Sequence, residues 1–288
     1  MRFPRLLLVI ALLAWLPAIP AAAQTQQSQQ HWELVAADDF SGSLAPHWSA
    51  YQGSPSCCRA TTWRTSQATV KDGRLVLTAQ RDRQGQWITG GVSAAGWPQA
   101  VRTYGKYVAR VRVDKGQGIS AVALLWPKSN VWPPEIDYYE LSGADGDRTQ
   151  ETATEHRAPD DATQQRVYQG DLTQWHTVSV EWLPKSITYF VDNKVIGRVT
   201  DQSFIPHQPM WPAFQMQIQQ DANGHGLATA TGPVHMYVDA FDVYAPVTPA
   251  PPAAPANPGN FLWIAVVLVA FVLLVAVLVI RRMRRRFR

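Results

Sequence analysis

The chain has 288 residues, a formal net charge of +4 and only two cysteines. The adjacent Cys57 and Cys58 cannot supply a disulfide framework, so the fold must depend on a hydrophobic core. We expect them to be a loop feature without a catalytic role, joined in a strained ring or bridged to another chain. Eight arginines lie in terminal segments that lack acids, and the remaining chain has four more acidic than basic residues. The basic balance therefore does not indicate nucleic-acid binding.

The N-terminus has the pattern of a secretory signal peptide over residues 1–23. Two arginines precede an uncharged run (6–20), and three alanines (21–23) offer a cleavage site for signal peptidase. An uncleaved N-terminal anchor is the alternative, but the run is short for a membrane span. Residues 24–30 (QTQQSQQ) contain no apolar residue and are predicted to form a disordered linker.

The C-terminus has the pattern of a membrane anchor. A segment with six prolines (246–260) is predicted to be an extended linker. Residues 261–280 are uncharged and almost wholly apolar, and twenty helical residues cover about 30 Å, the thickness of a bilayer core. Six arginines follow in 281–288, which predicts a cytoplasmic tail. A buried core helix is the alternative, but it would not end in six arginines.

Residues 31–245 remain as one domain, which this topology places outside the cytoplasm, in a periplasm or on a cell surface. Its signals are those of β-strands. Residues 69–79 alternate around an Asp-Gly turn, and 187–199 contain Asp-Asn between two apolar runs, so both segments are predicted hairpins. No amphipathic helix of useful length appears. Many short strands separated by turns predict an all-β fold, either a sandwich or a barrel.

One strand-like segment concentrates acidic residues: 132–141, which reads WPPEIDYYEL. Strict alternation would place Glu135 and Asp137 on one face and Glu140 on the other. A one-residue β-bulge at Tyr138-Tyr139 would return Glu140 to the first face. The alternative is that the acids lie on a solvent-exposed strand face and have no function. The apolar residues around them argue against such an exposed face.

Three acids on one face suit glycoside cleavage. Cleavage with retention uses two carboxyl groups about 5–5.5 Å apart, one as nucleophile and one as acid/base. With the bulge, Glu135 and Glu140 are roughly 13 Å apart along the strand, a separation that curvature and inclined side chains can reduce. Like charges at close range oppose joint ionisation, so one glutamate is expected to keep its proton near neutrality.

The segment Glu135-x-Asp137-x-x-Glu140 resembles the bulged motif of glycoside hydrolase family 16, the laminarinase and lichenase group. The similarity extends along nearly the whole domain, through the segments DF and HWS (39–40 and 47–49), VKDGRLVLTA (70–79), YGKYVAR (104–110), WHTVSVEW (175–182), YFVDN (189–193) and MYVDAFDVY (236–244).

The resemblance implies a jelly-roll β-sandwich, like those of concanavalin A-like lectins and glucanases, with a concave cleft. It implies Glu135 as nucleophile, Glu140 as acid/base and Asp137 as their electrostatic helper. Four further residues are candidates for substrate binding: Arg110, Trp132, His156 and Gln217. For Arg110 and Gln217 the alternatives are an ordinary surface charge and an edge-strand amide, and for the other two they are packing roles.

No cofactor and no catalytic metal are expected. Some members of the family bind structural calcium on the convex side, where Asp239 matches one ligand, so a structural calcium ion is the alternative. Two segments depart from the family pattern: GISAVALLWP (118–127) and QIQQDANG (217–224). Both departures lie where the cleft is expected, and they leave the polysaccharide undetermined.

The sequence therefore predicts a membrane-anchored, extracytoplasmic, endo-acting, retaining hydrolase of a β-glucan or another β-linked polysaccharide. Its expected partners are that polysaccharide and, through the C-terminal helix, a membrane. A transglycosylase would use the same residues. A non-catalytic carbohydrate-binding surface module and a purely structural envelope protein are alternatives from other classes, but both glutamates would be expected to be lost in them.

Overall fold

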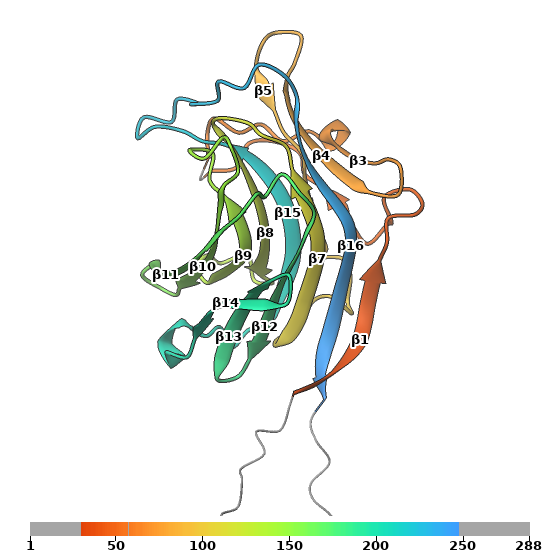
Figure 1. Cartoon of the computed structure of the whole chain (residues 1–288), viewed down its shortest axis with the longest axis vertical. Helices are drawn as coiled ribbons and strands as arrows, with labels where there is room; N and C mark the ends of the chain where they lie inside the picture. Colours follow the sequence, from red (N-terminus) through yellow and green to blue (C-terminus); the bar gives the residue numbers. More distant parts are fainter. Residues whose placement is uncertain (1–29, 57, 248–288) are drawn as a thin grey trace, which may run out of the picture. The chain divides into compact units, whose positions relative to one another are not determined.

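In the computed structural model, the described residues, 30–56 and 58–247, form two antiparallel β-sheets that pack into a sandwich (Figure 1). The larger sheet has nine strands. Its order is β14 (Lys194–Val199), β13 (Ser186–Val191), β12 (His176–Leu183), β7 (Gly105–Val113), β16 (Val234–Val247), β4 (Leu75–Arg81) and β3 (Ala68–Val70), with β1 (His31–Asp38) beside β16 and β5 (Trp87–Ile88) beside β4.

The smaller sheet has seven strands and holds the acidic segment. Its order is β11 (Ala162–Gln169), β10 (Gln150–Arg157), β9 (Glu135–Leu141), β8 (Ile119–Pro127), β15 (Met210–Ile218), β6 (Gly91–Ser93) and β2 (Ser49–Ala50). The helical segments among the described residues are two three-residue 3₁₀ turns, η1 (Thr65–Gln67) and η2 (Gln202–Phe204). The predicted all-β sandwich is confirmed, and its layout is that of a jelly roll.

Both predicted hairpins are present. β3 and β4 join through Asp72 and Gly73, with φ angles of 52° and 68°, and β13 and β14 join through Asp192 and Asn193, with φ angles of 49° and 62°. A two-residue turn with φ positive at both positions matches the twist of paired strands, and Asp, Asn and Gly accept that backbone most readily. These turn residues therefore set the strand pairing next to each turn, and the β13–β14 pairing shifts once more between Tyr189 and Phe190.

The core lies between the sheets. In β7, Tyr107, Ala109, Val111 and Val113 are fully buried, and the residues between them face outward. Each large apolar side chain buried in this way stabilises the fold by about 1.5–3 kcal/mol.

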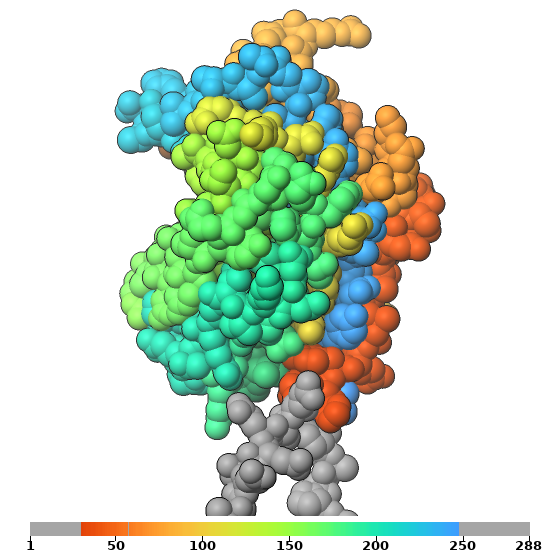
Figure 2. All heavy atoms as spheres, in the orientation of Figure 1, coloured from red at the N-terminus to blue at the C-terminus, as the bar shows by residue number. Residues whose placement is uncertain are grey.

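Aromatic rings join the two sheets across the core. Phe214 of β15 and Phe241 of β16 meet edge to face with centroids 5.5 Å apart, and Trp48 contacts both rings. The apolar layer supports the smaller sheet from behind and leaves its other face free for a site. In the all-atom view, the hairpin between β4 and β5 projects beyond the sandwich (Figure 2).

Several predictions fall on residues that the structure does not describe. These are the signal peptide (1–23), most of the 24–30 linker, the proline-rich linker from residue 248 onward, the membrane span (261–280) and the arginine tail (281–288). Within residues 30–56 and 58–247, no helix has the length and apolar character that crossing a membrane requires.

Candidate active site

The three acids lie on β9, which runs between β8 and β10. Asp137 and Glu140 are three residues apart on β9, but their partners on β8, Leu124 and Val122, are only two apart, and the register on β10 shifts in the same way. The extra residue defines a β-bulge at Tyr138-Tyr139. The bulge predicted from the sequence is therefore confirmed.

The bulge sorts the side chains of β9 between the two faces of the sheet. Tyr138 and Tyr139 are both buried in the core, together with Ile136 and Leu141. Glu135, Asp137 and Glu140 lie on the opposite face and line one pocket. Without the extra residue, Glu140 would point between the sheets, so the bulge assembles the three acids.

Glu135 begins the strand and is almost completely buried, with 9% of its surface exposed. Trp132 donates a hydrogen bond of 2.7 Å from Nε1 to Oε2 of Glu135. Burial, followed by the negative charge of Asp137, raises the pKa of Glu135, while His156 and the Trp132 hydrogen bond oppose that rise. The carboxylate thus lies in an apolar setting with one neutral donor and one cation beside it.

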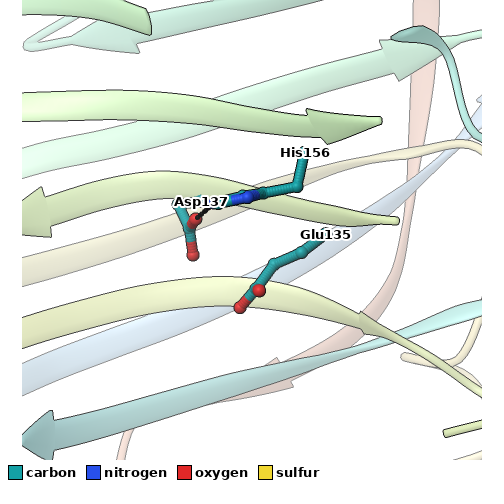
Figure 3. Close-up of side chains that lie close together, drawn as sticks. All are labelled: Glu135, Asp137 and His156. Carbon is teal, nitrogen blue, oxygen red and sulfur yellow. Dashed lines mark ion pairs between the residues drawn. The ribbon is translucent and has the colours of Figure 1, made fainter. Parts of the chain in front are cut away.

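Asp137 contacts a histidine from the neighbouring strand. His156 on β10 places Nε2 3.2 Å from Oδ2 of Asp137 and Nδ1 2.6 Å from Oδ1 of Asp161. Figure 3 shows the Glu135 and Asp137 carboxylates close together, with the His156 ring reaching Asp137. Burial alone would lower the pKa of His156, but Asp137 and Asp161 raise it to about 9. The ring is therefore an imidazolium near neutrality.

Glu140 has a different environment from Glu135. Thr154 of β10 donates a hydrogen bond of 3.0 Å from Oγ1 to Oε2 of Glu140. Burial, followed by the charge of Asp137, raises the pKa of Glu140 to about 7, and the Thr154 hydrogen bond opposes the rise. A group that exchanges its proton near neutral pH is suited to act alternately as acid and as base.

The acids lie in a cavity of about 610 Å³, a size typical of ligand sites. Val122 and Leu124 of β8 line it, and behind them they form a small apolar cluster with Ala213 of β15. Aromatic side chains form much of its wall: Tyr51, Trp63, Trp126, Trp132 and Trp211. Neither lysine nor arginine is found among the described residues that line it. The pocket therefore suits an uncharged ligand with flat apolar faces.

Three of the four predicted substrate-binding residues line this pocket with the acids: Trp132, His156 and Gln217. Trp132 also packs against His156, with ring centroids 5.8 Å apart. Two of them therefore also act on the acids directly, because Trp132 contacts Glu135 and His156 contacts Asp137.

The structure places Arg110 elsewhere, which corrects its assignment to the cleft. Arg110 lies on β7 in the larger sheet, where Ala109 and Val111 point into the core and Arg110 faces the opposite way. There it pairs with Asp239 and lies 4.7 Å from the Trp175 ring. Alternation along β7 separates the residues of its two faces, but it cannot indicate which sheet the strand joins.

Neither candidate metal site has a suitable donor set. Glu135, Asp137 and His156 bring one ligand atom each within 4.8 Å of one another. An imidazolium with a carboxylate at each nitrogen has no lone pair for a metal, so this set does not fit a resident ion. Asp239 pairs with the guanidinium groups of both Arg74 and Arg110. Two cations already neutralise it, which argues against a role in binding calcium.

Sequence reasoning missed several aromatic residues of the pocket. Trp126 could have been found, because it shares a strand face with Val122 and Leu124 by simple alternation. Tyr51 and Trp63 come from irregular segments far from β9 in the sequence, although their rings lie 4.7 Å apart in the fold. No local pattern marks such residues as part of the site.

The two-sheet fold and the acids on the outer face of one sheet define a β-sandwich glycoside hydrolase. The chain belongs to the glycosyl hydrolases family 16, whose family model matches residues 58–236. It is 25% identical over 186 residues to the endo-1,3-1,4-beta-glycanase ExsH of Rhizobium meliloti, covering 61% of this chain and 40% of that protein. It is 26% identical over 207 residues to a beta-glucanase of Rhodothermus marinus, covering 63% and 70% respectively.

Solved structures show the same fold. The laminarinase catalytic domain of Thermotoga petrophila aligns with a TM-score of 0.67 at 20% identity, covering 76% of this chain and 100% of that one. The endo-beta-1,3-glucanase of Pyrococcus furiosus aligns with the same score and identity, covering 76% and 96%. The chain spans less than half the length of ExsH and of the related glycanase EglC of Rhizobium meliloti.

Proposed function

We propose that this chain is an endo-acting, retaining hydrolase of an uncharged β-linked polysaccharide, with β-glucans as the first substrates to test. The observation that carries the proposal is the bulge at Tyr138-Tyr139, which brings Glu135, Asp137 and Glu140 onto one face of a single pocket. Endo action is supported by the names of the relatives, which include endo-1,3-1,4-beta-glycanases.

In the first step, a carboxylate oxygen of Glu135 attacks the anomeric carbon while Glu140 donates its proton to the departing glycosidic oxygen. The bond to the leaving chain breaks, and a glycosyl ester forms on Glu135. The hydrogen bond from Trp132 and the positive charge of His156 favour ionised Glu135 before the attack. The Glu140 pKa of about 7 keeps a protonated fraction available at neutral pH.

In the second step, Glu140 takes a proton from a water molecule, whose oxygen attacks the anomeric carbon from the side that the leaving group occupied. The ester bond breaks, Glu135 leaves as a carboxylate, and Glu140 is protonated again. Asp137 lies beside both glutamates, and its contact with His156 offsets its negative charge. This offset limits the repulsion that a third acid would otherwise add.

The lining of the pocket supports an uncharged substrate. A carboxylated or sulfated chain would bring negative charge next to three acids, in a pocket whose one basic side chain among the described residues is His156. Flat aromatic side chains suit the apolar faces of pyranose rings, and Gln215 and Gln217 offer hydrogen bonds to hydroxyl groups.

We further propose that the domain is held outside the cytoplasm by a C-terminal membrane helix. The support is in the sequence: an export signal at 1–23, an apolar run at 261–280 and six arginines in 281–288. A domain anchored in this way would act on polysaccharide in the periplasm or at the cell surface.

The test is to incubate the full chain with neutral β-glucans and with anionic exopolysaccharides, and to follow reducing ends and polymer length. We expect cleavage of at least one neutral β-glucan with a rapid fall in polymer length, and none in Glu135→Ala. Products longer than the substrate in the presence of an added acceptor would indicate a transglycosylase. Binding without any cleavage would contradict the proposed hydrolysis.

A further inference from the structure

A second carboxylate contacts the histidine of the site from outside the catalytic strand. Asp161 lies in the turn between β10 and β11, and its Oδ1 is 2.6 Å from Nδ1 of His156. The other ring nitrogen faces Asp137 at 3.2 Å. The imidazole therefore bridges a half-exposed carboxylate at the surface and a buried one beside Glu135.

The turn holds Asp161 in a defined place. Its backbone N–H donates to the carbonyl of Arg157 at 2.9 Å, and Arg157 pairs with Asp160 on the outside of the same turn. Asp161 has a φ of 52°, in the left-handed region that a non-glycine residue enters at some cost. Aspartate and asparagine tolerate this conformation best, so the backbone allows an acid here without requiring one.

We propose that Asp161 is a positioning residue for the hydrolysis, holding His156 doubly protonated and oriented so that its positive charge offsets Asp137 and favours ionised Glu135. The effect of Asp161 on catalysis rests on the proposed function. Its effect on the protonation of His156 rests only on the contact between the two side chains.

The physical reason is the number of protons on the ring. A neutral imidazole has one N–H and one lone pair, so with a carboxylate at each nitrogen one contact would be repulsive. Only the imidazolium donates to both. The titratable groups that interact with the charge of His156 are Asp161 from the turn and Glu135, Asp137 and Glu140 from β9. With one carboxylate removed, the positive charge loses part of its stabilisation, and the ring loses a fixed partner.

Asp161→Asn is the direct test, because it removes the charge and keeps the shape and the tolerance for left-handed φ. Asp160→Asn is the matched control, since it removes an acid from the same turn without touching His156. Asp161→Gly is a second variant that accepts the backbone conformation if the asparagine variant folds poorly.

The first measurement is an NMR titration of the full chain with labelled histidine, the His156 signals being assigned by their loss in His156→Gln. We expect the parent and Asp160→Asn to titrate near a pKa of about 9, and Asp161→Asn to titrate lower by about one unit or more. An unchanged His156 pKa in both Asp161 variants would overturn the proposal. This measurement needs no activity, so it stands apart from any failure of the proposed hydrolysis.

The second measurement isolates the attack by Glu135. A dinitrophenyl β-glucan oligosaccharide has a leaving group that needs no proton from Glu140, so its initial burst reports glycosylation alone. From pH 6 to pH 8.5 we expect the burst rate of Asp161→Asn to fall by at least about threefold relative to the parent. A His156 pKa lower by about one unit leaves roughly a quarter of the rings charged at pH 8.5, against about three quarters in the parent. Asp160→Asn should follow the parent. Equal pH profiles in all three proteins would overturn the positioning role.

Discussion

Trp132 donates a hydrogen bond of 2.7 Å from Nε1 to Oε2 of Glu135, only three residues further along the chain. The donor comes from the segment just before β9, where the ring also packs against His156. Trp132 thus reaches two parts of the site, the carboxylate of the proposed nucleophile and the imidazolium beside it. A residue predicted to bind substrate, with a packing role as the alternative, is thus also a hydrogen-bond donor to the proposed nucleophile.

Replacement of Trp132 by phenylalanine should separate these two roles. Trp132→Phe keeps an aromatic ring and loses the N–H donor. A hydrogen bond to a charged group contributes about 1.5–3 kcal/mol, so kcat/KM should fall by roughly 10- to 100-fold. Trp126→Phe is the control, because Trp126 lines the same pocket and makes no hydrogen bond to the acids. Equal losses in the two variants would show that only the aromatic surface matters.

Thr154 should set the alkaline limit of activity through Glu140. Its hydroxyl donates to the carboxylate of Glu140 and so opposes the rise of that pKa to about 7. Thr154→Val removes the donor, which raises the pKa of Glu140 and keeps the acid protonated to higher pH. The descending limb of kcat/KM should therefore move to higher pH by up to about one unit.

Thr152→Val is the matched control for Thr154→Val. Thr152 pairs directly with Glu140 across β9 and β10, but its side chain makes no hydrogen bond with the acid. The pH profile of this variant should match that of the parent. A shift toward lower pH in Thr154→Val would mean that Glu140 is not the group that must be protonated.

Glu151 on the core side of β10 should make stability depend on pH. It is fully buried, and burial together with the charge of Glu140 raises its pKa to about 8. Between the unfolded pKa of about 4.3 and that folded value, the native state holds a proton that the unfolded state has lost. The free energy of unfolding should therefore fall with rising pH across this window, by at most about 1.4 kcal/mol per pH unit from this group.

Glu151→Gln removes that titration and should flatten the slope between pH 5 and pH 8, as measured by urea unfolding. Part of the slope should remain, because burial also raises the pKa of Glu155 on the same face of β10. Glu33→Gln, at an exposed glutamate of β1, should leave the slope as it is. An unchanged slope in Glu151→Gln would show that Glu151 is not protonated in the native state.

The membrane proposal predicts a simple fractionation result. The full chain should partition with membranes, and truncation after Ala245 should release it, because the apolar run at 261–280 is then absent. Truncation after Ile280 keeps the run and loses the arginines, so it should still partition with membranes.

External protease should cleave near 246–260 and leave a C-terminal tag protected. A soluble full-length protein, or an externally accessible tag, would contradict the proposal.

The parts of the site that the sequence predicted are those with a short-range cause. The bulge could be inferred because Ile136 and Leu141 are expected to face the core while the three acids share the other face. Strict alternation cannot give this arrangement, but one extra residue in the strand can. The turns at 72–73 and 192–193 could be inferred because few residues accept φ above zero at both positions.

The parts that were missed depend on long-range packing. Arg110 was assigned to the cleft from the family resemblance, and alternation along its strand could not correct this, because alternation does not say which sheet a strand joins. Tyr51 and Trp63 reach the pocket from irregular segments, and Asp161 reaches His156 from a turn with no recognisable motif. Such contacts depend on how loops and turns fold back against the sheet, and the local pattern of apolar and polar residues does not determine this.

The division of labour between the glutamates can be tested by stereochemistry, independently of overall rate. Glu140→Ala lacks the acid, so natural polysaccharides with poor leaving groups should fail to react. Aryl β-glycosides with good leaving groups need no protonation and should still form the glycosyl ester on Glu135. That ester should accumulate, because the base for its hydrolysis is missing.

Azide needs no base and can replace water in Glu140→Ala, where it should attack the ester from the face that Glu140 occupied and give a β-glycosyl azide. In Glu135→Ala, azide should instead take the place of the missing nucleophile, enter from the opposite face and give the α-azide. Glu33→Ala should give neither product. The reverse pattern would exchange the two roles, because each azide can form only on the side where a carboxylate has been removed. If neither glutamate variant changed activity on a polysaccharide that the parent cleaves, the site on β9 would not be the catalytic one.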